Sequence, residues 1–267
     1  MKPKIEKIIS SILLYAIIAT ITIGLTRIFI CDRFTIKGDS MLPTYYTGKR
    51  IWVNKLVMGA RLYTDFDFDE SVLKCVRMPG LRELRTGDIA FFNDPYERYG
   101  DRIGFIINRV YVKRCVACPG DTLSVTNGFY VNSSGHKTKI PDHYQQVVAS
   151  MSDSQLRMMG AIYPVYPWVE TLGWNIKHMG PLYVPGKGDE IKLDSLSARI
   201  YDRLIEYESG EKPSVLDGAV YVNGQMTDSY TFKNDYYFFA GDNVLNSKDS
   251  RYIGLVPKDY IVGIAQP

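Results

Sequence analysis

The only long apolar stretch of the chain lies near its N-terminus and constrains the fold more than any other feature. From Ile8 to Thr26, 19 residues follow one another without a charge, and Arg27 is followed by Ile-Phe-Ile. About 20 apolar residues in a helix span the hydrocarbon core of a bilayer, so a transmembrane anchor is predicted at residues 8–30. A cleaved secretory signal is the alternative. It is disfavoured because the stretch exceeds a signal's roughly 7–15 apolar residues and no small-x-small site precedes Cys31.

Basic residues flank the apolar stretch in equal number, three on each side: Lys2, Lys4 and Lys7 within the short tail 1–7, and Arg27, Arg33 and Lys37 beyond the stretch. The positive-inside rule therefore leaves the orientation open from the residues alone. The position of Ser40, roughly ten residues after the stretch, is informative in either orientation. A function at this serine would be carried out close to a membrane surface.

The composition predicts a mostly β body. The 267 residues are 46% hydrophobic and include 20 Tyr, 11 Phe, 22 Gly and 13 Pro, which suits a sheet with many turns better than a helical bundle. The 32 basic and 29 acidic residues are nearly balanced, and neither sign forms a run of five. The charge distribution gives no support for a nucleic-acid partner.

The first candidate functional residue is Ser40, in the stretch Gly38-Asp39-Ser40-Met41-Leu42-Pro43-Thr44. A serine between Gly-Asp and a nearby proline lies on a constrained turn, where its hydroxyl can project into solvent. The same residues are also ordinary turn chemistry. Ser40 is therefore a candidate nucleophile whose assignment depends on its partners.

A second candidate is Lys113, within a β-like run. Alternation places Tyr111, Lys113 and Cys115 on one face of a strand, and Val112 and Arg114 on the other. A lysine desolvated by such neighbours has a lowered pKa and can accept a proton near neutral pH. A lysine extending from an ordinary strand edge is the alternative. Because the three histidines, at 136, 143 and 178, lie outside motif-like stretches, Ser-Lys chemistry is favoured over a Ser-His-Asp triad.

The cysteines predict neither a disulfide framework nor a metal or cofactor site. They are few and scattered, at positions 31, 75, 115 and 118. Cys115 and Cys118 form a C-x-x-C without a second ligand pair, and their spacing places them on opposite faces of a continuous strand. Pairing of one of them with Cys75 stays possible in an oxidising compartment.

The rest of the chain predicts a sheet interrupted by an insertion. Strand signals occur at five places: 51–57, 89–92, 103–117, 219–224 with a turn at Asn223-Gly224, and 236–240. We interpret 31–132 and 217–267 as one β domain and 133–216 as an inserted subdomain. The insertion has one short predicted helix, capped by Asp194 or Ser195 and closed by Gly210, with an apolar face of Leu196, Ile200, Leu204 and Tyr207.

A dense polar stretch, Gly241 to Arg251, directly follows the last predicted strand. It can be a hydrophilic loop, or its carboxylates and hydroxyls can orient a catalytic group.

These stretches together resemble the bacterial type I signal peptidases, in the longer form found in Bacteroides-like bacteria. The resemblance covers residues 1 to about 125 and 217–267. It rests on the anchor and on three motifs: Gly38 to Thr44, Tyr111 to Arg114 continuing to Pro119-Gly120-Asp121, and Gly241-Asp242-Asn243 continuing to Ser247-Lys248-Asp249-Ser250-Arg251. It implies an antiparallel β-sheet body with a single N-terminal transmembrane helix.

The resemblance also implies a function. The chain would be a membrane-bound serine endopeptidase that removes N-terminal signal peptides from exported preproteins, through an acyl-enzyme and without a cofactor. Its partners would be the lipid bilayer and preproteins with small-x-small cleavage sites. It would be a single-pass protein of the bacterial cytoplasmic membrane, with the catalytic domain on the extracytoplasmic side.

Residue roles follow from the matching positions. Ser40 would be the nucleophile and Lys113 the general base. Supporting roles would go to Ser247, which holds the lysine amine, to the pair Asp249 and Arg251 joined by Asp242 and Arg114, and to Met41 and Tyr111, which keep the lysine dry.

This sequence departs from the family pattern at two places. Gly38 stands where some members have a serine that donates to the oxyanion, and Val244-Leu245 replaces the usual Arg-Asp. Because Gly38 has no hydroxyl, the oxyanion would have to be stabilised by the backbone N–H of Ser40 and one other donor.

Two other functions remain open. A self-cleaving repressor-type protein shares Gly-Asp-Ser-Met and a lysine base, but it lacks an apolar anchor. The second alternative is a catalytically silent, membrane-anchored binding module on the same fold.

Overall fold

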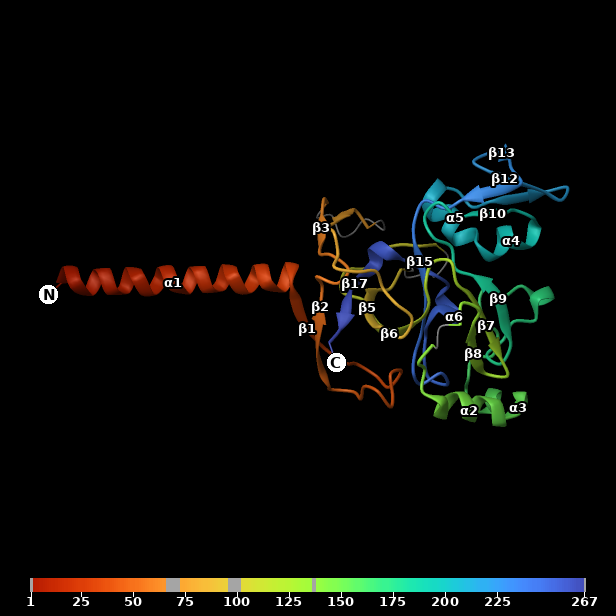
Figure 1. Ribbon diagram of the computed structural model, residues 1–267, viewed down its shortest axis with the longest axis horizontal. Helices are drawn as coiled ribbons and strands as arrows, with labels where there is room; N and C mark the ends of the chain where they lie inside the picture. Colours follow the sequence, from red (N-terminus) through yellow and green to blue (C-terminus); the bar gives the residue numbers. More distant parts are fainter. Residues whose placement is uncertain (1, 66–72, 96–101, 136–137, 267) are drawn as a thin grey trace.

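The computed structural model describes residues 2–65, 73–95, 102–135 and 138–266. A single long helix, α1 (Lys2–Phe29), projects away from a body built mostly of antiparallel strands (Figure 1). Within the span Ile5–Phe29, the most apolar window of 18 residues has a mean hydropathy of 2.3, and none of this window is buried in the body. The predicted anchor therefore forms one helix that is long and apolar enough to cross a membrane.

A seven-stranded antiparallel sheet forms the part of the body next to α1 (Figure 1). Its strands, in spatial order, are β1 (Cys31–Thr35), β2 (Arg50–Asn54), β17 (Ile261–Ala265), β5 (Ile89–Asn93), β6 (Val110–Ala117), β15 (Tyr236–Ala240) and β16 (Val256–Pro257). Strands far apart in the sequence are thus neighbours, since β17 lies between β2 and β5. The mostly β body predicted from composition and the antiparallel sheet implied by the resemblance are both confirmed.

The sheet is buried on both faces because its central strands are apolar on both sides. Along β5, Phe91 packs in a smaller cluster with Ile36 and Met41, whereas Phe92 packs in the main core. Successive side chains of a strand point to opposite faces, so the two clusters lie on opposite sides of the sheet. In the main core the rings of Phe92 and Phe239 stack with centroids 4.5 Å apart.

Smaller sheets complete the body. One contains β8 (Phe129–Asn132), β7 (Thr122–Thr126) and β9 (Met179–Tyr183), so the segment 133–216 contributes a strand to a sheet begun before it. The others are the pair β3 (Arg61–Tyr63) and β4 (Cys75–Arg77), the pair β10 (Glu190–Lys192) and β14 (Ser229–Thr231), and the three strands β11 (Ser214–Leu216), β12 (Ala219–Val222) and β13 (Gln225–Met226). Asn223-Gly224 connects β12 to β13, as predicted, with positive φ at both residues.

The insertion is more helical than its sequence predicts. The single predicted helix is two helices, α4 (Ser195–Ile200) and α5 (Asp202–Ser209), which break at Tyr201 because its ψ of 12° leaves helical geometry. Asp194 caps the first and Gly210, with φ of 92°, closes the second, as predicted. Further helices of the insertion are α2 (Asp142–Ser150), α3 (Asp153–Met158) and η1 (Glu170–Leu172). Two short helices, α6 (Ser250–Ile253) and η2 (Lys258–Tyr260), lie outside the insertion, near the end of the chain.

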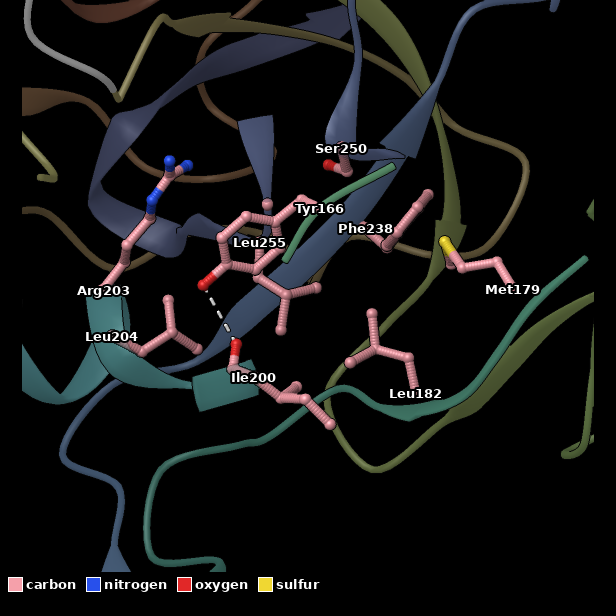
Figure 2. A pocket seen from close by; sticks show the side chains of 10 residues that line it. Tyr166, Met179, Leu182, Ile200, Arg203, Leu204, Phe238, Ser250 and Leu255 are labelled. Atoms are coloured by element: carbon pink, nitrogen blue, oxygen red, sulfur yellow. Dashed lines mark hydrogen bonds between the residues drawn. The ribbon is translucent and has the colours of Figure 1, made fainter. Parts of the chain in front are cut away.

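The insertion packs tightly against the last strands of the body. Figure 2 shows this contact: Tyr166 and Leu204 of the insertion and Phe238 of β15 line one small cavity, and the Tyr166 hydroxyl donates to the Ile200 carbonyl at 3.0 Å. The cavity left between them is only about 10 Å³, room for about one water molecule. This contact is a packing interface.

Two predictions about the β6 region are corrected. The predicted strand 103–117 is strand only from Val110, because the Asn93 amide donates to the carbonyls of Ile106 and Ile107 and holds that segment outside the sheet. Cys115 and Cys118 do not point to opposite faces: their sulfurs lie 3.6 Å apart. The strand ends at Ala117, and the chain then turns so that Cys118 comes back beside Cys115.

Candidate active site

Ser40 and Lys113, 73 residues apart in the sequence, meet in space. Lys113 Nζ donates to Ser40 Oγ at 2.5 Å. Ser40 lies on the turn that follows β1, and Gly38 supports this turn with φ of 89°, which side chains rarely adopt. Lys113 lies on β6 opposite Ala90 of β5. The sheet therefore brings a hydroxyl and an amine within proton-transfer distance.

The amine of Lys113 is largely withdrawn from water, as its alternation with Tyr111 and Cys115 predicts. The residue is 4% exposed, and the Tyr111 ring centroid lies 5.7 Å from Nζ; Met41, next to Ser40 in the turn, is fully buried in the smaller cluster. Burial lowers the pKa of Lys113 from 10.5 to about 8, although the Asp249 carboxylate opposes the shift. A substantial fraction of the amine is therefore neutral near pH 8.

The loop after β15 holds the backbone on either side of Ser40. The Asn243 N–H donates to the Ser40 carbonyl at 3.0 Å, and the Asn243 amide donates to the Asp39 carbonyl at 3.3 Å. Gly241 permits this approach, because a Cβ there would lie 2.5 Å from the Ser40 carbonyl oxygen. The polar stretch 241–251 is thus not a free hydrophilic loop but a support for the Ser40 turn.

Arg114 and Asp242 form a buried bidentate ion pair next to Lys113. The guanidinium Nε and Nη2 donate to the two carboxylate oxygens, each at 2.7 Å, and Nη1 donates to the Gly87 carbonyl. Thr44, at the end of the Ser40 turn, donates its hydroxyl to Asp242. This pair therefore connects β6, the loop after β15 and the Ser40 turn.

Asp249 and Arg251 form a second buried pair, with 0% and 1% of the residues exposed. Arg251 Nε and Nη2 donate to Asp249 at 2.8 Å, and the Gly241 N–H donates to the same carboxylate at 3.0 Å. Burial opposes the charge of Asp249, but Arg251 offsets this effect and lowers the pKa of the carboxyl group below its usual value. Each pair places an arginine against a carboxylate, so neither leaves an unpaired charge beside Lys113.

Ser247 lies in the same region, but it does not hold the lysine amine as the resemblance implies. It is 9% exposed, and within the described part of the chain no hydrogen bond joins its Oγ to Lys113. Its Oγ would lie 2.2 Å from a Cβ placed on Gly241. The structure thus places Ser247 against the loop backbone that supports Ser40.

A groove of about 500 Å³ opens beside Ser40 and Lys113. Apolar side chains from β1, its following turn, β5 and β6 line it: Phe34, Ile36, Phe91, Val110 and Val112. Asn246 and Lys248 line it from the loop after β15. Neither His143 nor His178 lines this groove, and His136 lies outside the described residues. The groove can hold an extended chain with small apolar side chains next to the Ser40 hydroxyl.

Sequence reasoning missed Asn243 and Thr44 as parts of the site. Asn243 lies inside a motif that the sequence analysis singled out, and Thr44 ends the Ser40 motif. Their contacts join positions about 200 residues apart, and no local pattern indicates them.

Known proteins similar to this chain agree on one family. The family description "Signal peptidase, peptidase S26" matches residues 8–267. A signal peptidase I from Buchnera aphidicola subsp. Schizaphis graminum is 26% identical over 251 residues, which cover 90% of this chain and 68% of the relative. A signal peptidase I from Helicobacter pylori strain J99 is 27% identical over 261 residues, which cover 92% and 77%.

Among solved structures, a signal peptidase I from Enterococcus faecalis V583 aligns with 68% of this chain and 96% of its own, at 17% identity and a TM-score of 0.29. That likeness is too distant to bear on the fold. The sequence matches span almost the whole chain, including both elements that bring Ser40 and Lys113 together. The chain therefore belongs to the signal peptidase family, peptidase S26, and is an enzyme of that family.

Proposed function

We propose that this enzyme is a membrane-anchored signal peptidase that cuts exported preproteins after small-x-small sequences, with Ser40 as nucleophile and Lys113 as general base. The observation that carries the proposal is the 2.5 Å contact between Lys113 Nζ and Ser40 Oγ at a buried amine whose pKa is lowered to about 8. A neutral amine in this position can take the hydroxyl proton, a role that contributes about 10²–10⁴-fold in rate.

The reaction would proceed through an acyl-enzyme. Lys113 accepts the proton of Ser40 Oγ while the oxygen attacks the scissile carbonyl carbon, and the resulting ammonium returns the proton to the leaving amine. Water then hydrolyses the ester. The Ser40 N–H suits the oxyanion, because it makes no hydrogen bond to protein among the described residues. Arg114, Asp242, Asp249 and Arg251 would act as positioning residues through the loop that supports Ser40.

Substrate selection would depend on the groove next to Ser40. The narrow apolar lining formed by Ile36, Phe91 and Val112 suits small side chains on an extended peptide. The helix α1 would anchor the enzyme, with its body on the extracytoplasmic side, and would place the groove near the membrane surface from which a preprotein emerges.

The test is cleavage of a purified preprotein in detergent by the full-length chain, compared with Ser40→Ala and Lys113→Ala. We expect cleavage after small-x-small by the parent and a loss of at least about 10³-fold in both variants. Matched controls are Ser214→Ala and Lys192→Ala, which change exposed residues outside the groove and keep parent activity. A variant of the pair that keeps near-parent activity would refute the dyad, and a parent that binds preprotein without cutting it would favour a binding module.

A further inference from the structure

A second groove, of about 620 Å³, lies where α1 joins the body. One wall is the last turn of α1, and the other comes from β3 and from the chain following β2. Figure 1 shows that α1 leaves the body on the side of β1, β2 and β3. This groove is separate from the one at Ser40, because the two share none of their lining residues.

The described residues that line the groove carry more positive than negative charge. Three cations, Arg27, Lys55 and Arg61, line it against a single carboxylate among these residues, Asp32, which gives them a net charge of +2. Asp32 contacts Arg27 Nε at 3.0 Å and lies 3.9 Å from Lys55 Nζ. Lys55 is half-buried, and burial lowers the pKa of its amine despite the nearby Asp32. Positive groups held in such a place favour an anionic partner.

Arg61 has no carboxylate of its own. Within the described part of the chain its guanidinium donates only to neutral acceptors: the carbonyls of Asp259 and Tyr260 and the amide oxygen of Asn93. The Asp259 carboxylate contacts Arg77 instead, at 3.4 Å. Burial lowers the pKa of Arg61. A negative charge in the groove would therefore stabilise the ionised form of this arginine.

The apolar lining of the groove is continuous with the surface of α1. Ile28 on the helix is 51% exposed and Leu62 on β3 is 39% exposed, and both line the groove. Arg27 lies in the last turn of α1, at the end of the apolar span Ile5–Phe29. A ligand for this groove combines a negative headgroup at the level of Arg27 with hydrocarbon beside Ile28 and Leu62.

We propose that this groove binds an anionic phospholipid of the membrane, with its headgroup phosphate among Arg27, Lys55 and Arg61 and an acyl chain along α1. The proposal rests on the membrane anchoring proposed above. Cations at a membrane interface attract anionic headgroups, and a phospholipid alone supplies the charge and the hydrocarbon at this depth. The bound lipid would be part of the junction between anchor and body.

The experiment is a lipid titration of the full-length chain in detergent micelles, with bound lipids counted by native mass spectrometry. Phosphatidylglycerol and phosphatidylcholine with the same acyl chains are the two probes, and inorganic phosphate is a competitor. We expect one phosphatidylglycerol per chain, at least about fivefold weaker binding of phosphatidylcholine, and no competition by millimolar phosphate.

The variants Lys55→Gln and Arg61→Gln each remove one cation of the groove and should weaken phosphatidylglycerol binding about fivefold. The matched control is Arg33→Gln, an exposed cation on β1 outside the groove, which should bind like the parent. Circular dichroism shows whether each variant folds. If Arg61→Gln does not fold, the lipid binding of Lys55→Gln decides the case.

Equal binding of the two lipids, or an equal loss in Arg33→Gln, would overturn the proposal. Cleavage of a soluble preprotein peptide is measured in parallel on the same samples. If the peptide is cut normally while the lipid preference is absent, only the groove proposal fails. A chain that does not cut the peptide shows a failure of the proposed catalysis instead.

Discussion

The two ends of β15 carry polar clusters that are built in opposite ways: the cluster at its first residue is partly buried, whereas the one beyond its last residue is buried. At its first residue, the Tyr236 hydroxyl donates to the Glu208 carboxylate of α5 at 2.8 Å. The same carboxylate accepts four further hydrogen bonds, from the Tyr230 hydroxyl, the N–H groups of Lys233 and Asn234, and the Asn234 amide. Beyond its last residue, the loop 241–251 lies against Ser40 and Lys113.

The difference lies in how fully each charged group is bonded. Glu208 accepts five hydrogen bonds, whereas the three-donor amine of Lys113 makes one hydrogen bond in the described part of the chain, to Ser40. A desolvated amine with a single partner, such as that of Lys113, can lose its proton at moderate pH. Near Lys113, most of the side-chain hydrogen bonds are made by Arg114 with Asp242 and by Arg251 with Asp249. The two charged groups therefore differ both in burial and in the number of hydrogen bonds that they make.

The largest effect is expected at the buried pair of Asp249 and Arg251 beside the active site. Arg251→Met leaves Asp249 as an unpaired buried charge, which should cost about 3–5 kcal/mol of unfolding free energy and reduce activity as well. Differential scanning calorimetry and preprotein cleavage measure the two effects. Lys74→Met is the control, because it breaks an exposed ion pair with Asp65 and should change stability by less than about 1 kcal/mol. Equal stability of the two variants would contradict the importance of the buried pair.

The Glu208 cluster should affect stability without affecting catalysis. Glu208→Ala leaves the two tyrosine hydroxyls and the neighbouring N–H groups without their acceptor, at an expected cost of about 1–3 kcal/mol. The rate of preprotein cleavage, measured well below the melting temperature, should stay within about twofold of the parent. A tenfold fall in rate with an unchanged melting temperature would show that this end of β15 is coupled to the active site.

The pH dependence of the rate follows from the proposed base: well below the pKa of Lys113, kcat/KM should fall about tenfold per pH unit. The base must be neutral, and the lowered pKa of Lys113 is about 8, so kcat/KM should rise with pH through this value and level off above it. Below pH 8 the ammonium form dominates and the rate falls. A peptide substrate without ionisable groups in this range isolates the enzyme's own titration. A midpoint near 10.5 would show that Lys113 is not desolvated in solution.

Local patterns predict the parts of this fold that depend on neighbouring residues. The strand at 236–240, the cap at Asp194 and the turn at Asn223-Gly224 are confirmed, because propensity, capping and turn geometry act within a few positions. The alternation that predicts Lys113 and Tyr111 on one face of a strand likewise depends only on neighbouring residues.

Patterns could not predict contacts that only the tertiary fold creates. The five donors to Glu208 come from residues 22 to 28 positions away, and Asn243 contacts a carbonyl 204 positions away. The positions of Cys115 and Cys118 depend on where β6 ends, which alternation does not specify. The pairing of Ser40 with Lys113 was implied by the family resemblance, whereas its geometry required the sheet.

The junction between α1 and β1 has a mechanical consequence. Only Ile30 separates the two elements; its N–H still bonds to Thr26, and its carbonyl accepts from the Lys55 N–H. The same β1 forms a wall of the groove beside Ser40 through Phe34. Helix and wall are therefore joined through a hydrogen-bonded residue rather than a long linker. If α1 spans a bilayer as proposed, a change in its tilt in a thicker or thinner bilayer should also shift the groove beside Ser40 relative to the membrane surface.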